Sequence, residues 1–293
     1  MHFHTNLLKR AVIKAGDYAL RLQDKIIKDD IVEENNYLNE KNAFSEIDYE
    51  VQNIIIKEII DIFPKKIGII AEEKIDYNIL NKFAHFGEFY ENKYTLVLDP
   101  IDGTKNYIEG RKFWGISFSI FYGDEPILGI IYYPALNIIL ETEKDKGLRI
   151  NNKLIKINNI KYENHHLVRL SGSLGEKKKE LKNIFPEDDI NYGSLVCSFL
   201  SMISENSNNL YKKNGYKSYI GGNSFIWDLG CCPLAWREAG GVVTNWKGFH
   251  INPFSKVNEN MKQRVSFIMA PNIDYANKLI QFSALSEEDV LLD

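Results

Sequence analysis

The stretch Leu96-Val97-Leu98-Asp99-Pro100-Ile101-Asp102-Gly103-Thr104 joins an apolar run to two carboxylates, a proline, a glycine and a hydroxyl residue. The apolar run predicts a strand, and the proline turns the chain because its ring fixes φ at about −65° and it has no N–H. Gly103 lets the backbone approach a ligand without a Cβ in the way. Both acids are therefore expected to face one small volume. Protonation or a bound cation relieves the repulsion between such carboxylates; we favour the cation, and oxygen ligands suit Mg²⁺ or Mn²⁺.

The composition favours a small ligand. The 293 residues include 36 Lys and Arg against 40 Asp and Glu, so a net charge of −4 provides no basic field for nucleic acid or an anionic membrane. Residues 1–6 do not resemble a signal peptide and no apolar run has membrane-spanning length, which predicts a cytoplasmic protein. Three cysteines without CxxC spacing predict neither disulfides nor a zinc site.

The first part of the chain predicts two helices. Apolar residues at helical spacing indicate a helix over 7–22, which is expected to end before the charged stretch 25–34. A polar loop is expected to run to Ala43. Ser45, three residues before Asp48, then predicts the N-cap of a second helix that ends at Phe63-Pro64.

Strands follow these helices. Residues 67–70 predict a short strand that runs into Glu72-Glu73, and a weakly patterned loop is expected over 74–92. Four further strands are predicted over 115–122, 127–133, 137–142 and 147–150. The pair Asn151-Asn152 supplies the positive φ angles that a tight hairpin turn needs.

The second half of the chain alternates strands with helices, which is typical of an α/β layer. The predicted elements are a strand over 167–170 and helices over 176–184, from Ser194, and over 228–239. We therefore predict two closely joined subdomains, an α+β part with the metal-binding loop over 1–160 and an α/β part over 161–293.

Asp99-Pro100-Ile101-Asp102-Gly103-Thr104-Lys105-Asn106-Tyr107 resembles the signature of the inositol monophosphatase family of magnesium-dependent phosphomonoesterases. Trp227-Asp228, followed by Glu238-Ala239-Gly240-Gly241, is similar to the family's second signature. Upstream, Ala71-Glu72-Glu73 is similar to its Gly-Glu-Glu, with alanine in place of glycine, and Ser45-Glu46-Ile47-Asp48 resembles its Thr-x-x-Asp. Four elements in the family's order carry the resemblance.

The resemblance implies a site with two or three Mg²⁺ ions, or Mn²⁺. The implied metal ligands are Glu72, Asp99, the carbonyl of Ile101, Asp102 and Asp228, with Asp99 bridging two ions. The implied substrate-binding groups are the N–H groups of Gly103 and Thr104, with Asp228 beside them. The hydroxyl of Thr104, oriented by Asp48, is expected to hold the attacking water together with Glu72.

The resemblance also implies a layered αβαβα sandwich of the sugar-phosphatase type, in the α+β or α/β class, with the site between two halves and a homodimer as the assembly. The expected activity is hydrolysis of inositol monophosphate or a related small sugar phosphate by a metal-activated water. Sensitivity to Li⁺ is expected, because this ion can occupy one of the magnesium positions. The expected partner is a small phosphorylated substrate, with no nucleic acid and no membrane.

Two alternatives stay open. Inositol-specific members use an acidic residue just before the Trp-Asp pair, whereas residues 219–226 contain no carboxylate. The spacing of Gly222, Ile226 and Trp227-Asp228, with Gly193-Ser194-Leu195 earlier, resembles the branch of 3′(2′),5′-bisphosphate nucleotidases. An alternative of another class is a regulatory binding protein with vestigial activity, which the complete ligand set and the acidic net charge disfavour.

Pro233 falls inside the helix predicted over 228–239 and is expected to kink or shorten its first turns. The neighbouring pair Cys231-Cys232 allows redox control, but burial as small packing residues is the favoured interpretation.

Overall fold

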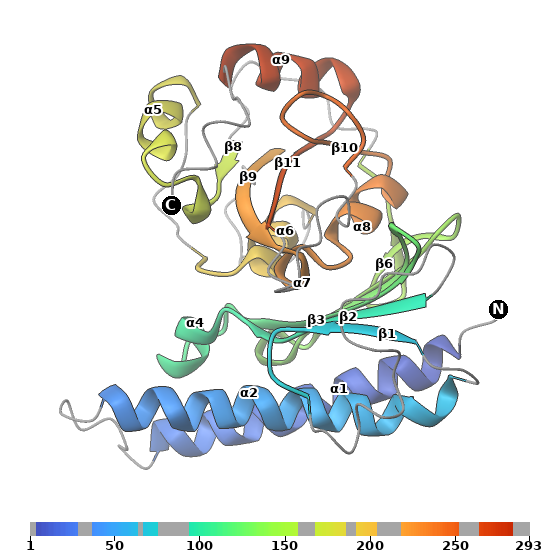
Figure 1. Cartoon of the computed structure of the whole chain (residues 1–293), viewed down its shortest axis with the longest axis vertical. Coiled ribbons are helices and arrows are strands. Elements are labelled where there is room, and N and C mark those ends of the chain that lie inside the picture. Colours follow the sequence, from blue (N-terminus) through green and yellow to red (C-terminus); the bar gives the residue numbers. More distant parts are fainter. Residues whose placement is uncertain are drawn as a thin grey trace.

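The computed structural model describes residues 4–28, 37–63, 67–75, 94–157, 168–185, 192–203, 218–251 and 264–283. This part of the chain forms five layers (Figure 1). Helices α1 (Thr5–Lys28) and α2 (Tyr37–Ile59) cover one face of a seven-stranded sheet, and a second sheet with its own helices lies over the other face. The predicted αβαβα sandwich is confirmed.

The first sheet follows chain order. Its strands are β1 (Gly68–Ala71), β2 (Tyr94–Asp102), β3 (Gly115–Tyr122), β4 (Glu125–Tyr133), β5 (Ile138–Glu143), β6 (Gly147–Ile150) and β7 (Lys153–Ile155). β1 and β2 are parallel, and the other neighbours are antiparallel. The predicted hairpin turn between β6 and β7 is present, with φ of 47° at Asn151 and 68° at Asn152.

The second sheet has the order β10-β11-β9-β8, with β8 and β9 parallel. Its strands are β8 (Val168–Leu170), β9 (Ser218–Phe225), β10 (Val242–Thr244) and β11 (Arg264–Ala270). Between the sheets lie α6 (Leu195–Ile203), α7 (Ile226–Leu229) and α8 (Cys232–Glu238), and on the outer face lie α5 (Lys177–Ile184) and α9 (Ile273–Ser283). The remaining short elements are α4 (Thr104–Ile108) and the 3₁₀ turns η1 (Ile60–Ile62), η2 (Pro134–Leu136) and η3 (Gly172–Leu174).

Four apolar clusters hold the described layers together, the smallest of them packing α7 against β1, β2 and β3. One joins α1 and α2 to the first sheet through residues such as Val12, Ile55 and Leu98, and an outer one joins α5 and α9 to the second sheet. The middle core contains α6, α8 and the facing sides of both sheets, with Trp236 fully buried in it. Within the described residues, no helix combines the length and the apolar character needed to cross a membrane.

Three helix predictions were wrong in detail. α1 continues to Lys28, because Asp24 and Lys25 lie on its exposed side and do not oppose the helix. α2 begins at Tyr37, so Ser45 lies inside the helix and is not its N-cap. The helix predicted over 228–239 is broken at Gly230, where φ is 45°.

Pro233 lies in the first turn of α8, so it does not kink a helix as predicted. A proline is well tolerated there, because the N–H groups of a first turn have no partner within the helix. The loop predicted over 74–92 is described only as far as residue 75, and the predicted boundary at 160 falls outside the described residues.

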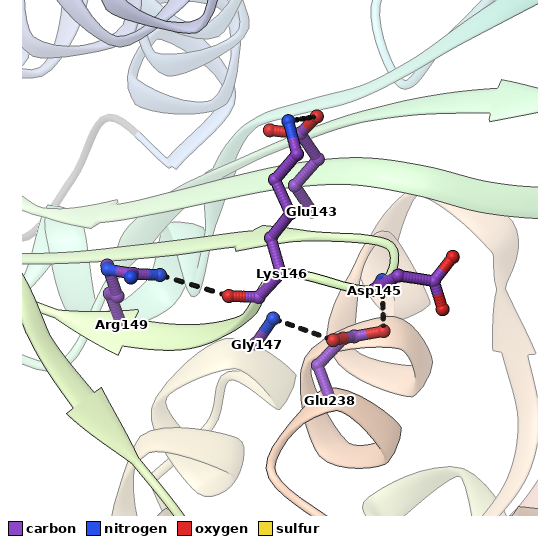
Figure 2. Close-up of polar contacts among 6 residues, drawn as sticks. All are labelled: Glu143, Asp145, Lys146, Gly147, Arg149 and Glu238. Atoms are coloured by element: carbon purple, nitrogen blue, oxygen red, sulfur yellow. Dashed lines mark hydrogen bonds and ion pairs between the residues drawn. The ribbon is translucent and has the colours of Figure 1, made fainter.

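Glu238 ties α8 to the turn between β5 and β6 (Figure 2). Its carboxylate accepts hydrogen bonds from the N–H groups of Asp145 over 2.8 Å and of Gly147 over 2.7 Å. Two residues later φ is 102° at Gly240, and a Cβ on Gly241 would lie 2.3 Å from Nε1 of Trp236. The Glu-Ala-Gly-Gly motif thus joins the middle helix layer to the first sheet.

Candidate metal centre

Glu72 and Asp99 lie side by side because their strands are parallel neighbours. The register sets Ala71 opposite Leu98, and the N–H of Glu72 then donates to the Leu98 carbonyl over 3.2 Å. The carboxyl groups of Glu72 and Asp99 lie close enough to interact, and burial together with neighbouring charges raises the pKa of both. The parallel pairing thus brings together carboxyl groups from two separate motifs.

Asp48 reaches the same place from α2. Its side chain is 5% exposed, and its pKa is raised to about 8 by burial and by the charges of Glu72 and Glu73. Oδ1 of Asp48 has no hydrogen-bond partner among the described residues. α2 therefore adds a third carboxyl to the Glu72–Asp99 pair.

Asp228 comes from the other half of the chain, on α7. The preceding Trp227 packs with Ile70 of β1 and Val97 of β2 and so seats α7 against the first sheet. The charge of Asp228 contributes to raising the pKa of Asp99, after burial and the charges of Glu72 and Asp102. All four predicted acidic segments are thus neighbours at one edge of the first sheet.

Asp102 has a second role that the sequence did not indicate. Its Oδ2 accepts hydrogen bonds from the Ser194 hydroxyl over 2.9 Å and from the Val196 N–H over 2.6 Å, at the start of α6. Burial raises the pKa of Asp102 to about 6, although these hydrogen bonds oppose the shift. Because Oδ2 is committed to the helix, a cation would have to use Oδ1.

Pro100 does not turn the chain as predicted, because β2 continues through it to Asp102, with only a shift in its pairing with β3 between Asp99 and Asp102, and the turn comes at Gly103. Gly103 adopts φ of 99° just before α4, and a Cβ there would lie 2.9 Å from the Phe113 carbonyl, so this position requires glycine. The Thr104 hydroxyl lies 3.2 Å from the Ile101 carbonyl and donates to it. The Thr104 hydroxyl was expected to contact Asp48, but it donates instead to the Ile101 carbonyl. This is the carbonyl expected to bind metal.

The acidic cluster has the character of a site for a divalent cation. Oδ1 of the buried Asp99 has no hydrogen-bond partner among the described residues, and burial raises the pKa of both Asp99 and Glu72, the latter to about 7. Glu72 keeps an exposed surface, so solvent screens part of this effect. A set of like charges with only oxygen donors fits Mg²⁺ or Mn²⁺.

The side chains do not form a finished cage. Within the described ranges, no three His, Cys, Asp or Glu side chains are arranged so that they could hold one ion. The residues fit a divalent cation in type, and their charges interact, but the side chains would have to rearrange to bind one ion together.

Comparison with known proteins identifies the family. The model of the inositol monophosphatase family matches residues 5–282. The chain belongs to the inositol monophosphatase family. It is thus a member of a family of phosphomonoesterases, and the resemblance drawn from the acidic motifs is confirmed.

Relatives with different activities are similarly distant from this family member. A fructose-1,6-bisphosphatase/inositol-1-monophosphatase of Thermotoga maritima is 28% identical over 74% of this chain and 76% of that protein. A 3′(2′),5′-bisphosphate nucleotidase of Buchnera aphidicola is 27% identical over 80% of each chain. The crystal structure of inositol monophosphatase II from Staphylococcus aureus covers 98% of both chains with a TM-score of 0.71 at 16% identity, which establishes the fold.

Proposed function

We propose that the chain is a Mg²⁺-dependent phosphomonoesterase that hydrolyses inositol monophosphate or a related small sugar phosphate. The observation that carries this proposal is the meeting of Asp48, Glu72, Asp99, Asp102 and Asp228 at the ends of β1 and β2. An oxygen of Asp99 is buried in this cluster without a partner. In a protein of this family, such a cluster supports a role in binding cations that act on phosphate.

The proposed ligands are Glu72, Asp99, the Ile101 carbonyl, Oδ1 of Asp102 and Asp228. Divalent ions supply Lewis-acid polarisation of a phosphate ester and lower the pKa of water. The N–H groups of Gly103 and Thr104, at the turn into α4, would bind phosphate oxygens, with Asp228 beside the substrate. No covalent bond between enzyme and phosphate is needed.

The Thr104 hydroxyl would change its acceptor when the site binds metal. When the Ile101 carbonyl serves as a ligand, the Thr104 hydroxyl loses its present acceptor. Oδ1 of Asp48 is a buried acceptor without a partner, and we infer that the hydroxyl turns toward it. Thr104 and Glu72 would then orient the attacking water, with Glu72 as general base.

A bisphosphate nucleotide is the second candidate substrate. A Cβ on Gly221 would lie 2.4 Å from the ring of Phe267, and one on Gly222 would lie 2.9 Å from the side chain of Leu174. A side chain at Gly221 would clash with the Phe267 ring, whereas one at Gly222 would need the end of the Leu174 side chain to shift, and neither residue supplies the acidic group that inositol-specific members use for substrate hydroxyls. This observation favours testing a nucleotide beside the sugar phosphates.

The test is a parallel assay of inositol 1-phosphate, fructose 1,6-bisphosphate and adenosine 3′,5′-bisphosphate with Mg²⁺, with and without Li⁺. We expect phosphate release from one of the three to require Mg²⁺ and to be inhibited by Li⁺. Asp99→Asn is expected to remain folded and to lose the activity. Near-normal turnover by this variant, or no release from any ester, would contradict the proposal. The proposed homodimer is checked by light scattering on the same sample.

A further inference from the structure

Gln52 of α2 is fully buried, and its side-chain amide bonds to the backbone that follows Glu72. Nε2 donates to the carbonyls of Glu73 over 3.0 Å and Lys74 over 3.1 Å. Oε1 accepts the N–H of Glu73 over 3.2 Å. One side chain therefore holds three backbone groups of the segment that leaves the sheet.

These bonds begin where the sheet pairing ends. The N–H of Glu72 donates to the Leu98 carbonyl, which extends the pairing of β1 with β2 by one residue. From Glu73 onward the backbone turns away from β2 and bonds to Gln52. Glu72 is thus fixed on one side by the sheet and on the other by a helix beneath it.

The same face of α2 carries Asp48. Residues four apart on a helix lie one turn above each other, so Asp48 and Gln52 share a face. Asp48 lies close enough to Glu72 and Glu73 to feel their charges. α2 therefore presents both a carboxyl and an amide to the segment 72–74.

We propose that Gln52 is a positioning residue, which fixes the backbone after Glu72 so that the Glu72 carboxylate lies beside Asp99 at the proposed cation site. This inference rests on the proposed function. Groups that orient a metal ligand typically contribute about 10- to 100-fold to metal affinity or activity. Gln52→Met keeps the size of the side chain and removes all three hydrogen bonds.

Gln23 of α1 provides a matched control. It is also buried, and its Nε2 donates to the carbonyls of Tyr107 over 2.8 Å and Arg111 over 3.1 Å. Its Oε1 accepts the indole N–H of Trp114 over 3.2 Å. Gln23→Met loses the same number of bonds from a neighbouring helix, but none of them is made to the segment 72–74.

The experiment compares both variants with the unsubstituted protein by Mg²⁺ titration calorimetry, phosphatase assay and amide hydrogen exchange without Mg²⁺. We expect Gln52→Met to bind Mg²⁺ about 10- to 100-fold more weakly and to lose protection at the Glu73 amide. Gln23→Met is expected to lower the melting temperature with Mg²⁺ affinity unchanged. If Gln52→Met does not fold, Gln52→Asn, whose shorter amide cannot reach the same groups, replaces it with the same expectation.

Equal Mg²⁺ affinity in Gln52→Met, or equal losses in both variants, would overturn the role of Gln52. Phosphatase activity of the unsubstituted protein is judged separately. If that protein binds Mg²⁺ through Asp99 but hydrolyses no ester, the proposed function fails, and the calorimetry still decides whether Gln52 positions Glu72.

Discussion

Ser194 and Asp102 are 92 residues apart in the chain and are joined by a 2.9 Å hydrogen bond from the serine hydroxyl to Oδ2 of the aspartate. The same serine oxygen accepts the N–H of Cys197 over 3.1 Å, as an N-cap does. Asp102, in the turn proposed to bind metal, thereby stabilises the first turn of α6 in the other half of the fold.

Loss of this N-cap should destabilise the protein. Ser194→Ala removes the acceptor for Cys197 and a donor to Asp102, and an N-cap loss costs about 1 kcal/mol. The measurement is urea unfolding. Ser201→Ala is the control, because its hydroxyl donates over 2.6 Å to the Ser198 carbonyl within α6 and caps nothing. A Ser194→Ala protein as stable as the control would contradict the capping role.

The acidic cluster predicts that the protein without Mg²⁺ is less stable at higher pH. The pKa is raised to about 6 for Asp102, about 7 for Glu72 and about 8 for Asp48, mainly by burial. An acid whose folded pKa is raised stabilises the fold fully below its unfolded pKa, about 4. This contribution is lost as the pH rises from about 4 through the folded values. Melting temperatures measured between pH 5 and pH 8.5 without Mg²⁺ should therefore fall.

Mg²⁺ should reverse this trend, because a cation favours the ionised carboxylates. The increase in melting temperature on adding Mg²⁺ is expected to be larger at pH 8 than at pH 5.5. Asp48→Asn should reduce the dependence of stability on pH. An increase that does not change with pH would show that the cation binds elsewhere.

Much of the site could be predicted from the sequence because its motifs are local. The run from Leu96 to Thr104 contains its own strand and helix start, and the glycine chemistry of Gly103 marks the turn between them, although β2 continues through Pro100, where a turn was predicted. The oxygen of Asp102 that bonds to α6 could not be predicted, because that contact depends on tertiary packing. Gln52 gave no signal beyond its place four residues after Asp48.

The helix boundaries show the same limit. Ser45 followed by Asp48 has the pattern of an N-cap, but the helix begins at Tyr37 and includes both. The break at Gly230 is equally tertiary, since a Cβ there would lie 2.2 Å from the hydroxyl of Ser117. Neither the start of α2 nor the break at Gly230 could be predicted from the few residues around it.

Glu238 is expected to contribute to stability and not to catalysis. Glu238→Ala removes the acceptor of the Asp145 and Gly147 N–H groups (Figure 2), and hydrogen bonds to charged groups contribute about 1.5–3 kcal/mol each when buried. Because these groups are partly exposed, we expect a total loss of about 1–2 kcal/mol in urea unfolding. Turnover per folded molecule should be unchanged, and Glu238→Gln should lose less stability. A drop in turnover at full folding would place Glu238 in the site.

The cysteines should be unreactive in the folded protein. Cys197, Cys231 and Cys232 are all buried, and burial raises the pKa of Cys231 to about 12, so almost no thiolate forms near neutral pH. A thiol reagent such as DTNB is expected to label none of the three until the protein is unfolded in guanidinium. Rapid labelling of the native protein would restore redox control as a possibility.

The most direct test of the proposed metal site is Mg²⁺ titration calorimetry at pH 8 on the unsubstituted protein and on Asp99→Asn, with circular dichroism to verify that both are folded. Asp99 stands on β2 beside Glu72 and is the ligand proposed to bridge two ions, so its substitution should affect Mg²⁺ binding most. We predict saturable Mg²⁺ binding by the unsubstituted protein and none by Asp99→Asn. Equal binding by both proteins, or no binding by either, would contradict the account.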